Sequence, residues 1–99
     1  MLDLIIPVYK DKKRLYSTLM SIGNYVSDLI YVTIVDDCSG DDYSDIVEVF
    51  QHCFPIRVIY LKENSGPGIA RQIGINNAKQ EYISFIDCGD IYVEPSSLK

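Results

Sequence analysis

Residues 30–37 read IYVTIVDD, a β-branched run that ends in two aspartates. A short apolar run of this kind is typical of a strand that is buried on both faces of a parallel sheet. Three further apolar runs occur at Leu2–Pro7, Ile56–Leu61 and Tyr82–Ile86. The sequence therefore predicts four strands.

Amphipathic stretches separate the four runs. The first follows Asp11 and ends near Gly23, and the second ends before Pro55. The third follows a glycine-containing loop and has Pro67 in its first turn, where a missing N–H costs nothing. We predict a helix in each stretch. The order βαβαβαβ indicates an α/β fold with a Rossmann-like, mostly parallel sheet and right-handed crossovers.

Small residues recur every four positions on the third predicted helix, at Ala70, Gly74 and Ala78. Residues four apart lie on the same face of a helix. We therefore expect this helix to sit close against the sheet.

Length and composition fit one small domain. The 99 residues are enough for a single domain, to which we assign residues 1–99. The 47% hydrophobic and 23% charged content is ordinary for a soluble globular protein. A core of this size gives modest stability, to which self-association could add. The net charge of -5 argues against a nucleic-acid partner, which needs clustered Lys and Arg.

Cysteine content indicates the redox compartment of the chain, and the length of its apolar runs indicates whether it can cross a membrane. Cys38, Cys53 and Cys88 form an odd set without a Cys-x-x-Cys pair, which predicts a reducing, cytoplasmic environment. No apolar run approaches the roughly 20 residues that span a bilayer. We expect no direct membrane insertion by this chain, although a longer protein that contains it could associate with a membrane.

Residues with distinctive chemistry follow each predicted strand. In open parallel sheets, ligands bind beyond the carboxyl ends of the strands, at the point where the topology switches direction. These strand ends, and the helix that follows the third strand, supply the candidates for a nucleotide site: Pro7, Val8, Tyr9, Asp36, Asp37, Gly66, Gly68, Arg71 and Asp87.

Four aspartates converge on the same rim of the predicted sheet: Asp36, Asp37, Asp87 and Asp90. Carboxylates held together repel one another, and a hard divalent cation such as Mg²⁺ or Mn²⁺ relieves the repulsion. A helix N-terminus with free N–H groups and the guanidinium of Arg71 both suit phosphate oxygens. Together these features indicate a metal-bridged nucleoside diphosphate.

Each feature also has a structural explanation. Aspartates at strand ends often cap a helix or tighten a turn. Gly66 and Gly68 could serve only the backbone of the turn, and Arg71 could pair with a carboxylate on the surface. The conjunction of all of them at one rim favours the nucleotide site.

Four blocks of the chain closely resemble family 2 of the inverting glycosyltransferases, which have the GT-A fold. The blocks lie at Leu4–Tyr9, Ile34–Ser39, Glu63–Ile75 and Glu81–Asp87, in the family's order and spacing. The match spans nearly all of residues 2–95. The resemblance identifies the chain as the N-terminal, nucleotide-binding half of such an enzyme, truncated before the acceptor half and the catalytic base.

The resemblance implies a nucleotide-sugar donor, commonly a UDP-sugar, with Mg²⁺ or Mn²⁺ bridging the diphosphate. By position, Pro7 and Tyr9 would lie along the base and Asp37 would hydrogen-bond uracil, while Arg71 would lie beside the nucleotide. Asp87 would lie near the ribose and the metal. A glycan or lipid-linked acceptor would receive the sugar in the full-length protein, in glycan or polysaccharide synthesis. The isolated chain would then bind the donor without transferring the sugar.

One position departs from the family pattern. Members usually read Asp-x-Asp-Asp where this chain reads Asp87-Cys88-Gly89-Asp90, so Gly89 replaces the usual main metal ligand. The metal prediction therefore depends on Asp87 and Asp90. The alternative function is a non-catalytic, degenerate nucleotide-binding or assembly module. A receiver-like signalling domain fits less well, because it needs an acidic pair after the first strand, where this chain has Val8 and Tyr9.

Overall fold

A computed structural model describes residues 2–23, 30–79 and 82–89. Its elements alternate between strand and helix in the predicted order, so the α/β class is confirmed. The elements are β1 (Leu2–Val8), α1 (Lys12–Ile22), β2 (Ile30–Asp36), α2 (Ser44–Phe50), β3 (Ile56–Tyr60), α3 (Pro67–Asn76) and β4 (Tyr82–Phe85).

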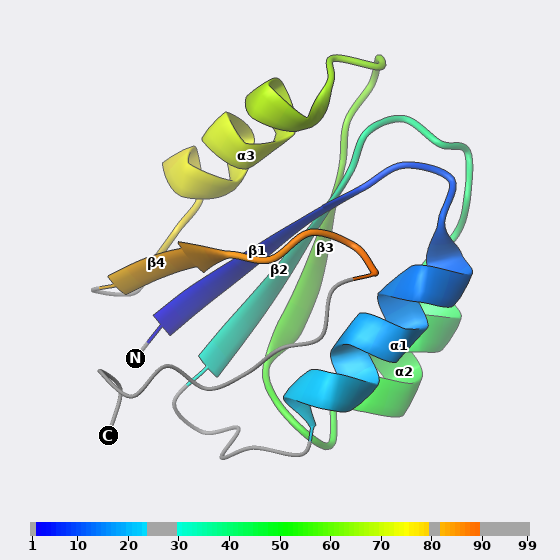
Figure 1. The fold of residues 1–99 in the computed structure, drawn as a ribbon, viewed down its shortest axis with the longest axis vertical. Helices are drawn as coiled ribbons and strands as arrows, with labels where there is room; N and C mark the ends of the chain where they lie inside the picture. Colours follow the sequence, from blue (N-terminus) through cyan, green and yellow to red (C-terminus); the bar gives the residue numbers. More distant parts are fainter. Residues whose placement is uncertain (1, 24–29, 80–81, 90–99) are drawn as a thin grey trace.

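The four strands form one parallel sheet in the order β3-β2-β1-β4. The chain moves from β1 outward to β2 and β3, then returns past β1 to β4 on its other side. In Figure 1, α1 and α2 cover one face of the sheet and α3 covers the other. The direction of the crossovers therefore reverses between β1 and β4. This is the topological switch point at which open α/β sheets bind their ligands.

The larger apolar core lies between the sheet and the helices α1 and α2. Successive side chains of a strand point to opposite faces, and here the even-numbered residues of β1 face these two helices. They pack against the apolar residues of α1. They also pack with Tyr43, Phe50 and Phe54, which lie before, within and after α2. The fully buried members include Leu4, Ile6, Leu15, Leu19 and Ile34.

The α3 face carries a much smaller apolar cluster, formed by Ile5, Val35 and Ala70. The expected close approach of this helix is confirmed at Gly74. A Cβ atom built on Gly74 would lie 2.5 Å from Cγ2 of Ile5, which is too close for any side chain. The missing side chain is what lets α3 settle against β1.

Polar contacts hold the C-terminal end of α3. Arg57 of β3 donates from Nε to Oγ1 of Thr33 at 3.1 Å and from Nη2 to the carbonyl of Asn77, just past the helix. Beyond that turn, the backbone N–H of Lys79 donates to Oδ2 of Asp3 at 2.7 Å, and Asp3 is fully buried. Hydrogen bonds from charged and polar groups thus help to hold α3 on its face of the sheet. On the other face, apolar packing holds α1 and α2.

Acidic residues precede two of the helices. Asp11 is the N-cap of α1, and its side chain makes no capping hydrogen bond. Its carboxylate lies 3.7 Å from Nε of Arg14 instead. Helix α2 begins at Ser44, whose backbone N–H donates to Oδ1 of Asp42 at 2.9 Å. That bond lowers the pKa of Asp42 below its ordinary value.

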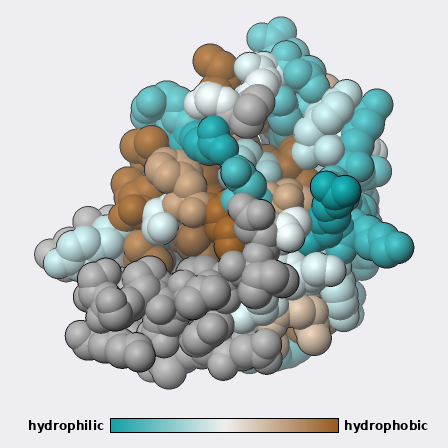
Figure 2. Space-filling view, in the orientation of Figure 1, coloured by the Kyte–Doolittle hydropathy of each residue, from teal (hydrophilic) through white to brown (hydrophobic). Residues whose placement is uncertain are grey.

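On the face drawn in Figure 2, apolar side chains gather at the surface over α3 and β4. They include Ile69 on α3 and Tyr82, Ile83 and Phe85 on β4, each at least 40% exposed. Within the described ranges, none of the helices combines the length and the apolar character that a membrane crossing requires.

Candidate functional site

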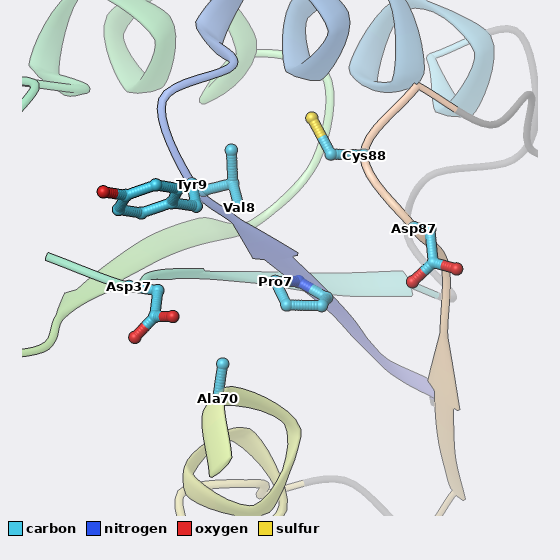
Figure 3. Close-up of a pocket in the computed structure, with 7 residues that line it drawn as sticks. All are labelled: Pro7, Val8, Tyr9, Asp37, Ala70, Asp87 and Cys88. Atoms are coloured by element: carbon cyan, nitrogen blue, oxygen red, sulfur yellow. The ribbon is translucent and has the colours of Figure 1, made fainter. Parts of the chain in front are cut away.

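A pocket of about 220 Å³ opens at the switch point between β1 and β4. Figure 3 shows the carboxylates of Asp37 and Asp87 on either side of it, with Ala70 directed into it from α3. Five of the predicted residues come together here, from the ends of three strands. The lining residues are Pro7, Val8, Tyr9, Asp37, Ala70, Asp87 and Cys88.

The end of β1 forms one wall of the pocket. The N–H of Asp37 donates to the carbonyl of Val8 at 2.9 Å, which extends the β1–β2 ladder to the rim and places the two residues side by side. Tyr9 follows and is 47% exposed. Its ring lies 5.3 Å from the ammonium of Lys10, which has a positive φ of 52°. An exposed aromatic face at this point suits stacking against a planar ligand group.

Asp37 is buried and holds the loop that leads into α3. Its Oδ1 accepts the N–H of Ser65 at 2.7 Å and its Oδ2 accepts the N–H of Gly66 at 2.8 Å. Only 5% of the residue is exposed. Bonds from backbone N–H groups to a carboxylate are stronger than neutral ones, so Asp37 fixes the start of α3 relative to β2.

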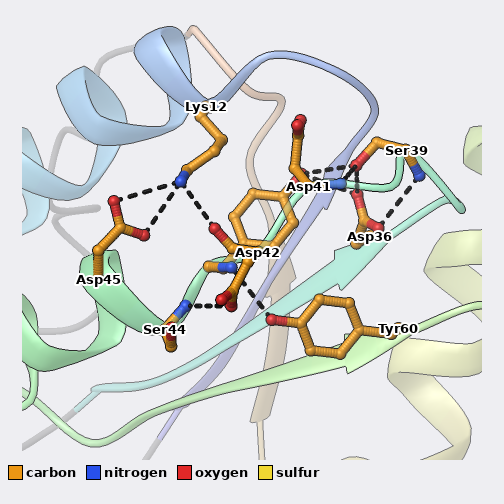
Figure 4. Close-up of polar contacts among 9 residues, drawn as sticks. Lys12, Asp36, Ser39, Asp41, Asp42, Ser44, Asp45 and Tyr60 are labelled. Carbon is orange, nitrogen blue, oxygen red and sulfur yellow. Dashed lines mark hydrogen bonds and ion pairs between the residues drawn. The ribbon is translucent and has the colours of Figure 1, made fainter.

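Asp36 does not line the pocket, although the sequence placed it with the site. Adjacent strand residues point to opposite faces, and Asp36 lies on the side of α1 and α2 (Figure 4). Its Oδ1 accepts the hydroxyls of Ser39, at 2.5 Å, and of Tyr43, at 2.7 Å. The Asp36 carboxylate therefore organises the loop between β2 and α2.

The same region contains a buried tyrosine and a lysine that ties α1 to α2. Burial raises the pKa of Tyr43 well above its ordinary value, and the backbone N–H of Tyr43 donates to the hydroxyl of Tyr60. Lys12 donates to the carbonyl of Asp42 at 2.7 Å and to Asp45 at 3.0 Å (Figure 4). The hydrogen bond from Lys12 lowers the pKa of Asp45. These contacts position the helices and lie outside the pocket.

Helix α3 begins beside the pocket with Gly66 as its N-cap and Pro67 at its first position. Gly66 has a φ of 88°, which L side chains rarely adopt, so the glycine is needed for the turn. At Gly68, by contrast, an added Cβ would meet nothing within 4 Å. Gly68 therefore leaves open space at the helix start.

Arg71, one turn into α3, forms an ion pair with Asp87. Its Nη2 lies 2.7 Å from Oδ1 of Asp87, and the side chains are 37% and 63% exposed. The predicted surface pairing of Arg71 is therefore present, and its partner is itself a lining residue of the pocket.

The described residues do not by themselves form a metal site. Within residues 2–23, 30–79 and 82–89, no three or more His, Cys, Asp or Glu side chains gather where they could hold an ion. Asp87 supplies one carboxylate. The second predicted ligand, Asp90, lies outside the described residues.

Two lining residues were not among the sequence candidates. Ala70 was predicted only as part of the small face of α3, and that smallness is also what leaves room above the helix. Cys88 donates from Sγ to the carbonyl of Asp11 at 3.4 Å, and burial raises the pKa of its thiol to about 11. The cysteine itself carried no sequence signal beyond its place next to Asp87.

Comparison with known proteins gives the same family as the sequence blocks. The sequence model described as "Glycosyl transferase family 2" matches residues 3–99. Poly(ribitol-phosphate) beta-N-acetylglucosaminyltransferase TarS of Staphylococcus aureus is 32% identical over 98% of this chain and 17% of its own length. The putative teichuronic acid biosynthesis glycosyltransferase TuaG of Bacillus subtilis is 32% identical over 91% of this chain and 36% of its own length.

A solved structure agrees in fold. The crystal structure of residues 1–349 of S. aureus TarS in complex with UDP-GlcNAc aligns with a TM-score of 0.79 and 31% identity. The alignment covers 89% of this chain and 26% of that one. Because the family match extends over nearly the whole chain and the sheet has the corresponding fold, the protein belongs to glycosyl transferase family 2.

Proposed function

We propose that the pocket between β1 and β4 binds the nucleotide part of a sugar-nucleotide donor, and that this nucleotide is a uridine diphosphate. The observation that carries the proposal is the conjunction of an exposed tyrosine and two carboxylates around a pocket at the topological switch point. The crystal structure of the relative TarS in complex with UDP-GlcNAc supports the choice of uridine.

The base end of the donor belongs beside Tyr9. Pro7, Val8 and Tyr9 line one side of the pocket. Asp37 also lines it and already accepts hydrogen bonds from two backbone N–H groups. A carboxylate oxygen can accept more than one hydrogen bond. Asp37 can therefore hold the loop and still accept the N–H of uracil.

The diphosphate end belongs beside Arg71 and the start of α3. Arg71 already reaches the rim through its contact with Asp87. A guanidinium binds phosphate oxygens through paired, charge-assisted hydrogen bonds. Neither Gly66 nor Gly68 carries a side chain that would keep an anion away from the start of α3.

We propose Mg²⁺ or Mn²⁺ as the cofactor, with Asp87 and Asp90 as its ligands from this chain. A bound divalent ion would offset the charge that develops on a leaving diphosphate. Of these two proposed ligands, Asp87 is the one that lies within the described residues.

The reaction we propose is inverting transfer of the sugar to an acceptor hydroxyl of a glycan or lipid-linked acceptor. The chain spans 17% of TarS and 36% of TuaG. We place the catalytic base and the acceptor site in a longer protein, outside this single donor-binding domain. The chain alone is then expected to bind donor and to transfer no sugar, and self-association is expected to add to its stability.

The test is calorimetric titration of the purified protein with UDP, with and without Mn²⁺, using GDP and ADP as matched controls. Selective UDP binding supports the proposal, and a gain in affinity with Mn²⁺ supports the metal. Equal binding of all three nucleotides, or no binding of any, would refute the uridine assignment. Sugar transfer by the chain alone would refute the proposal that the catalytic base and the acceptor site lie outside this domain.

A second candidate function is a nucleotide-binding module that performs no transfer in any context. Gly89 favours it, because this residue stands where the resemblance to the family implies a carboxylate. The two candidates differ in one measurement, the effect of Mn²⁺ on UDP affinity. UDP binding that does not depend on Mn²⁺ would favour the module.

A further inference from the structure

One face of α1 and its N-cap contacts the turn that carries Asp87. We call this face, formed by Asp11, Arg14 and Thr18, the seat of the turn. The backbone N–H of Gly89 donates to Oγ1 of Thr18 at 2.9 Å, and Thr18 is fully buried. One residue earlier, the thiol of Cys88 donates to the carbonyl of Asp11. Both contacts join residues more than 70 positions apart in the chain.

A third contact completes the seat. A Cβ atom built on Gly89 would lie 3.1 Å from Cδ of Arg14, so the aliphatic part of that side chain lies directly against the glycine. Asp11, Arg14 and Thr18 are three and seven positions apart, so they share one face of the helix start and of α1. The turn thus rests on a single helix face.

The seat explains why the chain has glycine at position 89. Gly89 has a φ of 100°, a backbone conformation that L side chains rarely adopt, and Arg14 fills the direction in which a side chain would grow. The positive φ makes a larger residue strained here, and its side chain would also have to displace Arg14. Gly89 is therefore the residue that lets the turn close onto α1, rather than only a missing carboxylate.

The turn places Asp87 between two anchors. On one side, the N–H of Ile86 donates to the carbonyl of Ile5 at 3.2 Å and continues the β1–β4 ladder. On the other side, the N–H of Gly89 is bound by Thr18. Figure 3 shows that the carboxylate of Asp87 is directed toward the pocket from this short segment.

We propose that Thr18 is a positioning residue of the nucleotide site, which acts by fixing the turn at residues 87–89 and with it the carboxylate of Asp87. Thr18 does not line the pocket, so its effect on binding is indirect. The inference rests on the proposed function, because it assigns Thr18 to the binding of the same uridine nucleotide.

The experiment compares four forms of the protein by UDP titration in the presence of Mn²⁺. Thr18→Val removes the hydroxyl and keeps the shape, and Thr18→Ser keeps the hydroxyl. Ile22→Val, a buried change one turn further along α1, lowers stability and removes no hydrogen-bonding group. We expect Thr18→Val to weaken UDP binding about tenfold, with Thr18→Ser and Ile22→Val close to the unaltered protein.

A second readout follows the turn itself. Amide hydrogen exchange at Gly89 should speed up about tenfold in Thr18→Val and stay slow in Thr18→Ser, since only the former loses the acceptor. Unchanged exchange, or equal loss of UDP affinity in Thr18→Val and Ile22→Val, would overturn the inference while leaving the proposed function intact. Failure of the unaltered protein to bind UDP would overturn both the proposed function and the binding role of Thr18.

Discussion

Arg71 of α3 and Asp87, which follows β4, are joined across the end of β1 by a contact of 2.7 Å between Nη2 and Oδ1. Asp87 lines the pocket, and Arg71 extends to its rim from the helix on the opposite side. Both side chains are partly exposed. An ion pair in such a position contributes about 1 kcal/mol or less to folding. It can therefore exchange partners at small cost when an anion arrives.

Replacing Arg71 with alanine should affect ligand binding far more than folding. We expect the thermal midpoint to change little, since the ion pair is partly exposed. The affinity for UDP should fall by about tenfold or more, because a charged hydrogen bond to phosphate is worth about 2 kcal/mol. Parallel calorimetry and thermal melting measure the two effects, and Arg71→Lys serves as the control that keeps the charge and loses the planar fork. Unchanged UDP affinity in Arg71→Ala would exclude a phosphate contact.

The substitution Asp37→Asn should destabilise the fold. Asparagine can accept one of the two N–H bonds, but its amide group opposes the other, so one buried donor loses its partner. A free energy of unfolding lower by about 2 kcal/mol is expected, measured by urea denaturation. Glu48→Gln, the same chemical change at an exposed position of α2, should leave stability within about 0.5 kcal/mol. If the two variants behave alike, Asp37 does not hold the loop.

Two glycine-to-alanine substitutions on α3 should have opposite effects. Gly74→Ala places a Cβ 2.5 Å from Cγ2 of the buried Ile5, and overpacking of this kind costs about 1–3 kcal/mol. Gly68→Ala meets nothing within 4 Å and should be neutral or slightly stabilising, because alanine is the better helix former. Denaturant midpoints of the two variants give the comparison. In a background of Ile5→Ala, which removes Cγ2, the cost of Gly74→Ala should shrink, and this coupling would show that the contact is the cause.

The reactivity of Cys88 should report its burial through pH. Burial raises the pKa of this thiol from an ordinary 9.0 to about 11. The thiolate is the reactive form, so iodoacetamide at pH 8 should modify exposed Cys53 much faster than Cys88. Because the folded pKa lies above the unfolded one, the stability contributed by the neutral thiol is present below pH 9. It is lost as the pH rises toward about 11.

Peptide mass spectrometry after timed alkylation separates the two cysteines. In concentrated urea their rates should converge, because the burial that distinguishes them is gone. Equal rates in the native protein would contradict the packing of Cys88 against α1.

The arrangement of the elements could be predicted from the sequence because the strands are short apolar runs. β1 and β2 are almost wholly buried, so their runs stand out against the amphipathic stretches. The predicted ends of β3 and β4 each extended one residue too far. The N–H groups of Leu61 and Ile86 still donate to the neighbouring strand, but both residues lie just outside the strands.

The site was predictable only in part, because single-residue spacing does not fix the direction of a side chain. Asp36 and Asp37 are neighbours in the sequence, yet one supports the loop before α2 and the other lines the pocket. The pairing of Arg71 with Asp87 and the seat of Gly89 on Thr18 join residues from distant segments. No local pattern encodes such contacts, which appear only once the sheet order is known.

The unequal covering of the two sheet faces has a consequence for how the molecule opens. Helix α3 contributes only Ala70 to a small buried cluster with Ile5 and Val35, whereas α1 and α2 share the large core. Asp37 and Arg57 hold the two ends of α3 through hydrogen bonds. Segments with few buried apolar contacts open locally before the rest of a domain. When α3 separates from the sheet, Ala70 moves away from the pocket and Arg71 from its rim. A nucleotide that contacts both α3 and the turn at Asp87 should oppose this opening. Bound nucleotide should therefore slow proteolysis of the loop at residues 62–66.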